Sequence, residues 1–459
     1  DASAPIRVNI GTGSKFLFGS QSSGGLTVNA NITNNSASGV ALNITNSSSG
    51  TVALNGVISG NNGLVLDQFG TGKIVLAGAN TYAGGTTLNM VTTNTSVGEI
   101  WASNNAAFGT GTITTGTGTN YVRSGSVTIS NAVAIGAGTT LRLGGISSSS
   151  DTSTWSGVIS GAGALNYTLS DNGLYLTGTN SSFGGGVNVG SSGKLYVSKL
   201  GMAGANSSIG TNGTVTISSA SGTSGSADIN WTGAADETSD KNFALTTASS
   251  SATAGLRIYA RGATNASLTL NGNIDSTGIS NKVITLAGYA TNTLRMNGLI
   301  NETAGYTNSV VVGASSSGTV ILNGTNTFSG AVTITQATAG QYTWLQTTNI
   351  GISGAASALG KNGTINIGST NDTAFTILKY TGTGETSDKV INLAGTVGGA
   401  TLDQSGTGNL KFTSAITGTG TGAKTVRLAG SSAGTGELSG SLTNAGGNII
   451  SVSKSGTGT

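Results

Sequence analysis

The densest groups of residues that could do acid–base chemistry lie in two short segments of identical sequence. The segment ETSDK occurs at 237–241 and again at 385–389, so each copy places two carboxylates and an ammonium within five residues. Paired carboxylates can cleave or eliminate glycosidic bonds, one acting as acid and the other as base or nucleophile. An active site is seldom duplicated at a fixed offset, whereas a solvated turn often is. We therefore interpret both segments as structural turns. Their charged residues are Asp236, which precedes the first copy, with Glu237, Asp240 and Lys241, and in the second copy Glu385, Asp388 and Lys389.

The composition excludes several other kinds of active site. None of the 459 residues is His or Cys, which excludes Ser-His-Asp triads, thiol catalysis and the common zinc sites. The Gly-Gly-x-Gly-x-Asp calcium repeat is absent, and the acidic residues are too scattered for a calcium array. The prediction is a protein that is not an enzyme, with no catalytic residue, no metal and no cofactor.

One segment imitates a phosphate-binding loop. GTGTGAKT at 418–425 nearly matches the P-loop pattern, but Ala423 replaces the Gly that should precede Lys424. A P-loop also requires a following helix whose N-terminus faces the phosphate. The residues that follow, VRLAG, have the pattern of a strand. We interpret the match as chance in a chain rich in Gly-Thr dipeptides.

Charge and hydropathy limit the classes of partner and the cellular locations that the sequence favours. The net charge of +3 comes from 19 basic and 16 acidic residues, without a basic cluster that would indicate nucleic-acid binding. No run of 18 apolar residues indicates a membrane-spanning helix. The absence of Cys and the start at Asp1 without Met are typical of a processed export substrate. The prediction is an extracellular protein exported across a bacterial outer membrane.

The composition favours many short strands. Gly accounts for 77 residues and Pro5 is the only proline. The abundant Gly, Thr, Ser and Asn are weak helix formers, whereas short runs of Thr, Val and Ile broken by Gly and Asn favour strands. The fold class is therefore predicted to be all-β.

A five-residue pattern, apolar–any–Leu–any–Gly, sets the strand rhythm. Its middle position accepts Arg while its neighbours stay apolar, which indicates that the middle side chain faces water and its neighbours face a core. The closing Gly is expected to supply a turn with free choice of φ. The ten copies close at Gly56, Gly78, Gly145, Gly178, Gly272, Gly288, Gly298, Gly324, Gly395 and Gly430, with Met296 in place of Leu in one of them.

The spacing of these glycines predicts a stack of coils. Gly56 and Gly78 are 22 positions apart (78 − 56), and other gaps show that coil length varies. A coil of about twenty residues cannot bury its apolar face alone, so stacked coils must share one core. The prediction is a β-solenoid of roughly twenty coils.

A longer repeat overlies the coils. The two ETSDK segments are 148 positions apart (385 − 237), and GTNGTVTI at Gly210 parallels GKNGTINI at Gly360 at an offset of 150 (360 − 210). An earlier, shorter copy carries FGTGTITT after 107. The chain then reads as N-terminal strands at 1–51 and three solenoid repeat units at 52–153, 154–292 and 293–459, in an array that is expected to continue.

The motif at the start of each repeat carries a family resemblance. GTGKIVLAGANTYAGGTTLN at 70–89 resembles the autotransporter-associated β-strand repeat, and SGTVILNGTNTFSGAVTI at 317–334 keeps the same pattern. SDNGLYLTGTNSSFGGGVNV at 170–189 departs by one inserted Ser before the aromatic residue. The motif residues are Gly78, Asn80, Thr81 and Tyr82, then Gly178, Asn180 and Phe183, then Gly324, Asn326, Thr327 and Phe328.

The motif residues are expected to be structural. Asn and Thr at a tight corner can bond neighbouring backbone, and Asn residues stacked on successive coils can form ladders. The aromatic residues Tyr82, Phe183 and Phe328 are expected to pack into corners rather than bind sugars.

The resemblance implies fold, location and partners. Passengers of this family are typically right-handed parallel β-helices at the cell surface, with an outer-membrane β-barrel elsewhere in the full-length protein. The predicted function is a non-enzymatic extracellular solenoid, either an adhesin stalk or a subunit of a self-assembling fibre or sheath. Its expected partners are other copies of itself, surface glycans and other cell surfaces. The alternative is a carbohydrate-active or glycan-binding β-helix, although the four Trp residues (Trp101, Trp155, Trp231 and Trp344) are irregularly spaced.

Overall fold

The computed structural model divides into two compact units, Asp1–Val215 and Thr216–Thr459, which are described separately. Among the described residues every regular element is a β-strand, so the all-β prediction is confirmed. No helix there could span a membrane. The structure describes residues 5–9, 11, 17–20, 23–90, 98–146, 150–168, 172–219, 225–247, 254–313, 317–369, 375–396, 399–419, 422–430, 434–442, 444 and 449–458.

The strands alternate between buried and partly exposed side chains. In β9 (Lys73–Leu76) the side chains of Ile74 and Leu76 are buried, whereas Lys73 and Val75 are partly exposed. A strand with this period can bury only one face, because successive side chains point to opposite sides. The five-residue pattern therefore marks strands that send their Leu into a shared core.

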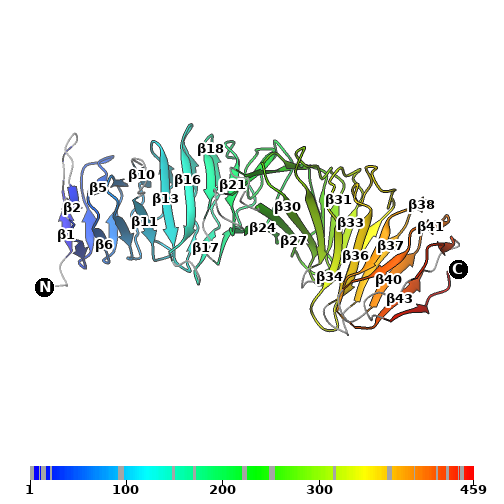
Figure 1. Ribbon diagram of the computed structural model, residues 1–459. Helices are drawn as coiled ribbons and strands as arrows, with labels where there is room; N and C mark the ends of the chain where they lie inside the picture. Colours follow the sequence, from blue (N-terminus) through cyan, green and yellow to red (C-terminus); the bar gives the residue numbers. More distant parts are fainter. Residues whose placement is uncertain are drawn as a thin grey trace. The chain divides into compact units, whose positions relative to one another are not determined.

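In unit 1 the strands form parallel sheets, named here A to D, that run from coil to coil. Figure 1 shows these strands following one another in chain order, coloured from blue to green. Sheet A holds β1 (Ile6–Val8), β4 (Ile32–Asn34) and β7 (Ile58–Gly60). Sheet B holds β2 (Leu17–Ser20), β5 (Leu42–Asn46), β8 (Leu64–Gln68), β10 (Thr86–Met90), β12 (Ile113–Thr115), β15 (Val133–Ile135) and β18 (Ile159–Gly161).

The other two sheets of unit 1 complete its coils. Sheet C holds β3 (Leu26–Val28), β6 (Thr51–Leu54), β9, β11 (Glu99–Ala102), β13 (Thr119–Ser124), β16 (Thr140–Gly145), β19 (Ala164–Tyr167) and β21 (Val187–Gly190). Sheet D holds β14 (Thr128–Ile129), β17 (Thr152–Trp155), β20 (Gly173–Leu176) and β22 (Lys194–Val197).

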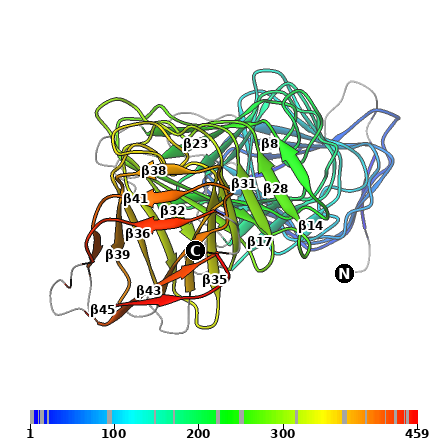
Figure 2. The same ribbon diagram turned by 90° about the vertical axis from the view of Figure 1, so that its right-hand side faces the viewer.

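Unit 2 has the same plan, with sheets named E to H. Figure 2 looks onto its end and shows β43 and β45 along one side, with β38 and β41 along another. Sheet E holds β23 (Thr214–Ser219), β26 (Asn242–Thr247) and β29 (Ile274–Ser276). Sheet F holds β25 (Glu237–Ser239), β28 (Ser267–Leu270), β31 (Thr293–Met296), β33 (Gly318–Leu322), β35 (Tyr342–Thr347), β37 (Phe375–Tyr380), β40 (Gly399–Gln404), β43 (Lys424–Ala429) and β45 (Ile450–Lys454).

The remaining two sheets of unit 2 cover its other sides. Sheet G holds β24 (Gly225–Trp231), β27 (Ala254–Ala260), β30 (Lys282–Gly288), β32 (Asn308–Gly313), β34 (Val332–Gln336), β36 (Thr364–Ser369), β39 (Val390–Leu393) and β42 (Ile416–Gly418). Sheet H holds β38 (Glu385–Ser387), β41 (Leu410–Phe412) and β44 (Gly436–Leu438).

The pairing register confirms a parallel β-solenoid and gives its coil length. Ile32 pairs with Ile58 in sheet A, and Val332 pairs with Ile365 in sheet G. Hydrogen bonds between neighbouring coils join residues 22, 26 or 33 positions apart. The described residues form about 15 turns, where the sequence predicted roughly twenty. The number of turns is smaller than predicted because many coils are longer than the 22 residues between Gly56 and Gly78.

Of the ten closing glycines only Gly430 has a positive φ, of 134°, so most of them do not supply the turn that was expected. None of Gly56, Gly78 and Gly324 has a positive φ. Instead, a Cβ on Gly78 would lie 2.2 Å from the carbonyl oxygen of Gly56 in the preceding coil, and one on Gly324 would lie 2.3 Å from that of Gly298. Glycine is needed there because backbones of successive coils touch, not because the turn needs freedom in φ.

An Asn ladder lies beside these glycines, at positions other than the motif residues Asn80, Asn180 and Asn326 for which the sequence predicted ladders. The side-chain amide of Asn297 donates to the Asn271 side-chain oxygen at 2.8 Å, and that of Asn323 donates to Asn297 at 2.9 Å. Each of these residues directly precedes a closing glycine, so the pattern repeats once per coil. The bonds are exposed and tie the coil edges together.

Candidate functional site

The first repeat motif forms a corner that bonds the preceding and the following coil. The side-chain oxygen of Asn80 accepts the backbone N–H of Ile58 at 2.8 Å, and its amide donates to the Ala107 carbonyl at 2.7 Å. The backbone N–H of Thr81 donates to the Ile58 carbonyl at 2.9 Å. Asn80 is buried, so this single side chain satisfies backbone groups that water cannot reach.

The third motif repeats this arrangement. The side-chain oxygen of Asn326 accepts the N–H of Ile300 at 2.7 Å, and its amide donates to the Ala358 carbonyl at 2.7 Å. Thr327 donates its backbone N–H to the Ile300 carbonyl at 3.1 Å. The two corners lie in different units and have the same bonding.

The second motif differs at the residue that holds the corner. Asn180 is exposed, and its side-chain oxygen accepts from Asn206 at 3.0 Å. The N–H of Ile159 instead donates to the Ser181 hydroxyl at 3.0 Å, and Ser181 is buried. The inserted Ser moves the sequence register by one position, because the aromatic Phe183 stays in the core. Ser181 therefore occupies the place that Asn80 and Asn326 hold.

The aromatic residue of each motif is enclosed by a glycine loop from the next coil. Tyr82, Phe183 and Phe328 are at most 1% exposed, so their ring faces are closed to ligands. The backbone carbonyls of these residues accept from Thr110 at 3.0 Å, Thr211 at 3.0 Å and Lys361 at 2.8 Å. The residue before each donor is a glycine with positive φ: Gly109 at 62°, Gly210 at 73° and Gly360 at 71°.

These glycines have no room for a side chain. A Cβ on Gly109 would lie 2.4 Å from the Tyr82 carbonyl oxygen, and one on Gly210 would lie 2.2 Å from that of Phe183. We call each aromatic residue with its glycine a clamped corner. The sequence showed Gly210 and Gly360 as landmarks of a repeat without revealing this role.

The Tyr82 hydroxyl is part of the core and not a reactive group. It lies 2.5 Å from the hydroxyl of Thr86. Burial raises the pKa of Tyr82 well above its ordinary value, and the bond to Thr86 only partly opposes this. The hydroxyl therefore stays protonated, and the other two corners have Phe at this position.

The two acidic segments are bonded to backbone and aromatic groups. The Glu385 carboxylate accepts the N–H groups of Ile350 at 2.6 Å and Gly351 at 2.9 Å, and Asp388 accepts that of Ser353 at 2.6 Å. In the first copy Asp236 accepts the N–H of Ser267 at 2.8 Å, and Glu237 accepts the Trp231 indole N–H at 2.5 Å. In both segments the carboxylates thus accept N–H groups of neighbouring backbone or indole.

Lys389 turns inward to bond carbonyl groups of the preceding coil. Its ammonium donates to the carbonyls of Gly360 at 3.0 Å and Asn362 at 2.5 Å. Gly360 belongs to a clamped corner, so the lysine stabilises the loop that encloses Phe328. Lys424, the lysine of the P-loop-like segment, is buried as well and donates to the Gly395 carbonyl.

Burial of Lys389 predicts a pH-dependent stability. Loss of hydration lowers the pKa of Lys389 below its ordinary 10.5, although Asp388 and Glu385 oppose the shift. The unfolded chain then binds this proton more tightly than the folded chain. The resulting penalty is fully present below the folded pKa and is relieved as the pH rises toward 10.5.

We expect the stability of the wild type, relative to a Lys389→Met variant, to increase as the pH rises toward 10.5. Urea unfolding midpoints measured from neutral pH upward provide the test. Lys361→Met, which replaces an exposed lysine on the same loop, is the control and should follow the wild type. If the difference in urea midpoint between the wild type and Lys389→Met does not change with pH, the lowered pKa of Lys389 is contradicted.

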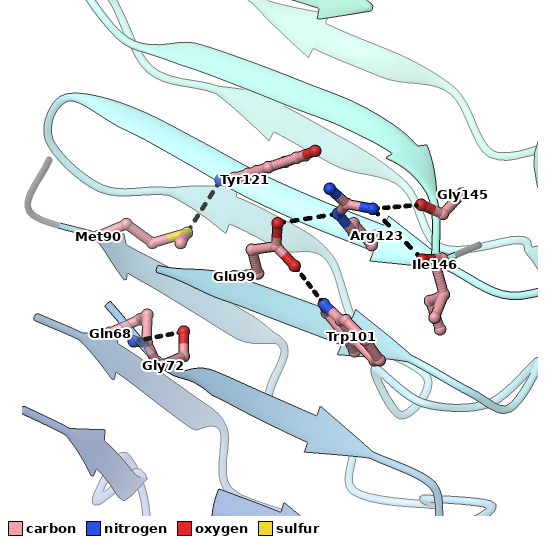
Figure 3. A network of polar contacts seen from close by, with 9 residues as sticks. All are labelled: Gln68, Gly72, Met90, Glu99, Trp101, Tyr121, Arg123, Gly145 and Ile146. Carbon is pink, nitrogen blue, oxygen red and sulfur yellow. Dashed lines mark hydrogen bonds and ion pairs between the residues drawn. The ribbon is translucent and has the colours of Figure 1, made fainter. Parts of the chain in front are cut away.

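A polar network covers the outer face of sheet C in unit 1 (Figure 3). The Glu99 carboxylate accepts from the Arg123 guanidinium at 2.9 Å and from the Trp101 indole at 2.6 Å. Arg123 also donates to the carbonyls of Gly145 and Ile146, at 3.2 and 3.3 Å. The Lys73 ammonium lies 3.5 Å from the centre of the Trp101 ring. In this network the cations and the indole ring therefore contact each other or Glu99.

A second cluster lies on sheet G in unit 2. Arg257 donates to Asp228 at 2.5 Å. The Arg261 guanidinium lies over two rings, 4.8 Å from the centre of Tyr259 and 4.3 Å from that of Tyr289. Sequence reasoning found neither cluster, because the contributing residues lie on different coils and share no motif. The signal available in the sequence was the presence of Arg or Tyr at the strand positions that face water.

Sequence comparison places one stretch of the chain near a known adhesin. Over 86 residues, 18% of the chain, it is 41% identical to the adhesin BmaC autotransporter of Brucella suis biovar 1 (strain 1330). The chain spans only 2% of the length of that protein. No family model and no solved structure matches the chain.

Proposed function

We propose that this chain is part of a non-enzymatic bacterial surface protein, in which a β-solenoid serves as the stalk or body of an adhesin. The observation that carries the proposal is the parallel solenoid together with the partial match to an autotransporter adhesin. The match supports export across the outer membrane and exposure at the cell surface. A chain without Cys suits such a route, because no unwanted disulfide can form before export.

The use of the charged residues supports a structural role over a catalytic one. Glu385, Asp388 and Lys389 bond backbone groups at coil corners. Glu302 likewise accepts the N–H groups of Asn308 and Ser329, at 2.8 and 2.9 Å. Carboxylates that accept backbone N–H groups in this way satisfy the backbone of the coil corners. We therefore propose that the repeats build a scaffold, not a reaction centre.

The sense of the solenoid is part of the proposal. Parallel strands joined by a crossover connection are right-handed in about 98% of cases. The resembled family also has right-handed parallel β-helices. A right-handed coil is therefore proposed for both units.

A self-assembling fibre or sheath is the second candidate role. Strands of successive coils pair in parallel register through their backbones, as Ile32 pairs with Ile58. The same backbone pairing can join coils of two separate chains. The proposed partner is a second copy of the same solenoid.

Adhesion of protein-coated beads to cells tests the proposed function. We expect beads coated with folded protein to adhere more than beads coated with the heat-unfolded protein. Electron microscopy over a concentration series separates the two candidate roles. Isolated particles at every concentration support a stalk, filaments support a fibre, and the absence of both adhesion and filaments would contradict the proposal.

A further inference from the structure

The outer face of sheet F in unit 2 carries a pair of stacked aromatic rings. Tyr342 on β35 and Phe375 on β37 are register partners on neighbouring coils. Their ring centres lie 5.1 Å apart and the ring planes are inclined by 12°. Tyr342 is 46% exposed, unlike the enclosed rings of the clamped corners.

Each of the two rings turns its outer face toward a hollow. Because nearly parallel rings on adjacent coils face one another, their free faces look toward the preceding and the following coil. The preceding coil offers Ser317 and Gly318 beside Tyr342, and the following coil offers Gly399 as the register partner of Phe375. The hollows measure about 570 Å³ at Tyr342 and about 260 Å³ at Phe375.

Polar and basic side chains border these hollows. Gln341 and Thr319 line the larger hollow, and Thr401 and Thr425 line the smaller one. The Arg427 guanidinium lies 5.9 Å from the centre of the Phe375 ring and lines the smaller hollow.

A further pair of groups extends the basic border. On the same sheet face, the Lys379 ammonium lies 6.0 Å from the centre of the Trp344 ring. Asp403 is the register partner of Lys379 and supplies an acidic group. Its carboxylate already accepts from the Ser405 hydroxyl. Two cations beside aromatic rings on one sheet face favour an anionic ligand.

We propose that this surface, the aromatic ridge of Tyr342, Trp344, Phe375, Lys379 and Arg427, binds acidic oligosaccharides. The C–H face of a pyranose ring packs on an aromatic face, while its hydroxyls need donors and acceptors such as Gln341 and the threonines. A carboxylate or sulfate on a neighbouring sugar pairs with Arg427. The inference rests on the proposed adhesin function and specifies its ligand class and its site.

Another aromatic pair provides a contrast within the same chain. Tyr175 and Tyr196 on sheet D of unit 1 stack with centres 4.1 Å apart and planes inclined by 2°. A Cβ on Gly173 would lie 2.8 Å from the Tyr196 ring, so backbone packs directly against that ring. This stacked pair, against which backbone packs, is the matched control for the pair on sheet F.

An array of acidic and neutral glycans tests the proposal. Its acidic probes are oligogalacturonate, sialyllactose and a heparin octasaccharide, and its neutral probe is lactose. We expect binding to at least one acidic glycan and weaker binding to lactose. Tyr342→Ala and Phe375→Ala should each lower the affinity about tenfold or more, because each removes one stacking face. Arg427→Gln should weaken binding of the acidic glycan alone, and Tyr196→Ala should leave binding unchanged.

The outcomes separate this proposal from the adhesin function. Tyr342→Leu keeps an apolar side chain without a ring face, so it should lose binding while circular dichroism shows an intact fold. Absence of binding to every acidic glycan, or equal binding by Tyr342→Ala and Tyr196→Ala, would overturn the ridge as a glycan site. Bead adhesion that persists in the Tyr342→Ala/Phe375→Ala variant, or after enzymatic removal of cell-surface glycans, would also overturn it. Such adhesion would assign a protein partner and leave the adhesin proposal standing.

Discussion

Replacing Gly360 by Ala is expected to destabilise unit 2 by more than about 3 kcal/mol. Two costs combine at this position. A non-glycine residue in the left-handed region costs about 1–2 kcal/mol, and Gly360 has a φ of 71°. The added Cβ would also lie 2.5 Å from the Phe328 ring and 2.7 Å from its carbonyl oxygen. The clamped corner would have to open, and the bond from Lys361 to that carbonyl would be strained.

Gly340 gives this experiment an internal control. Its φ of 70° matches that of Gly360, but a Cβ there would meet nothing within 4 Å. Gly340→Ala should therefore cost only the backbone term of about 1–2 kcal/mol. Equilibrium urea unfolding of both variants, followed by circular dichroism, measures the difference. Equal losses for the two variants would show that the aromatic contact contributes nothing.

Replacing Asn326 by Ala is expected to cost roughly 2–6 kcal/mol. The change removes two hydrogen bonds of 2.7 Å and leaves the Ile300 N–H and the Ala358 carbonyl without a partner inside the core. Each buried backbone group that loses its partner costs about 1–3 kcal/mol. The bonds connect three successive coils, so we expect the loss to spread to both neighbours of the corner.

The exposed Asn323 lies three residues away and is the matched control. It donates to Asn297 in the Asn ladder at 2.9 Å, where water can replace the bond. Asn323→Ala should change the free energy of unfolding by about 0.5 kcal/mol or less. Thermal and urea unfolding of the two variants would decide the matter, and a loss at Asn323 as large as that at Asn326 would mean that the ladder, not the corner, holds the coils.

Much of the fold follows from the strand rhythm of the sequence. Residues such as Ile74 and Leu76 alternate with Lys73 and Val75 at the period of a strand that buries one face. A coil of that size must stack to cover its apolar side, so a parallel solenoid follows from the repeat alone. The number of turns did not follow, because loops such as the one between β35 and β36 lengthen individual coils without changing the strand pattern.

The corner residues show where sequence spacing stops being sufficient. The motif aligned Asn180 with Asn80, but the core fixes the position of Phe183, and the insertion leaves Ser181 as the buried residue. The burial of the aromatic ring, and not the position of the Asn in the sequence, thus decides how the second motif aligns with the other two. The closing glycines show the same limit, since only the structure reveals that Gly78 touches the backbone of Gly56.

The outer-face clusters could not be found by motif at all. Tyr342 and Phe375 are 33 residues apart (375 − 342) and meet only because the coil between them has that length. A change in the length of one loop would shift their register and separate the rings. The sequence therefore indicates which single residues face water, but it does not indicate which residues lie beside them on the neighbouring coils.

The most direct test of the central claim measures binding and cleavage in the same tube. Purified protein is incubated with acidic and neutral polysaccharides, and both the retained glycan and the newly formed reducing ends are measured over time. A protein that holds surfaces together should retain acidic glycan in proportion to its concentration and release no new ends. Reducing ends that accumulate in proportion to protein and time, and that disappear on replacement of a carboxylate, would show an enzyme and contradict the account.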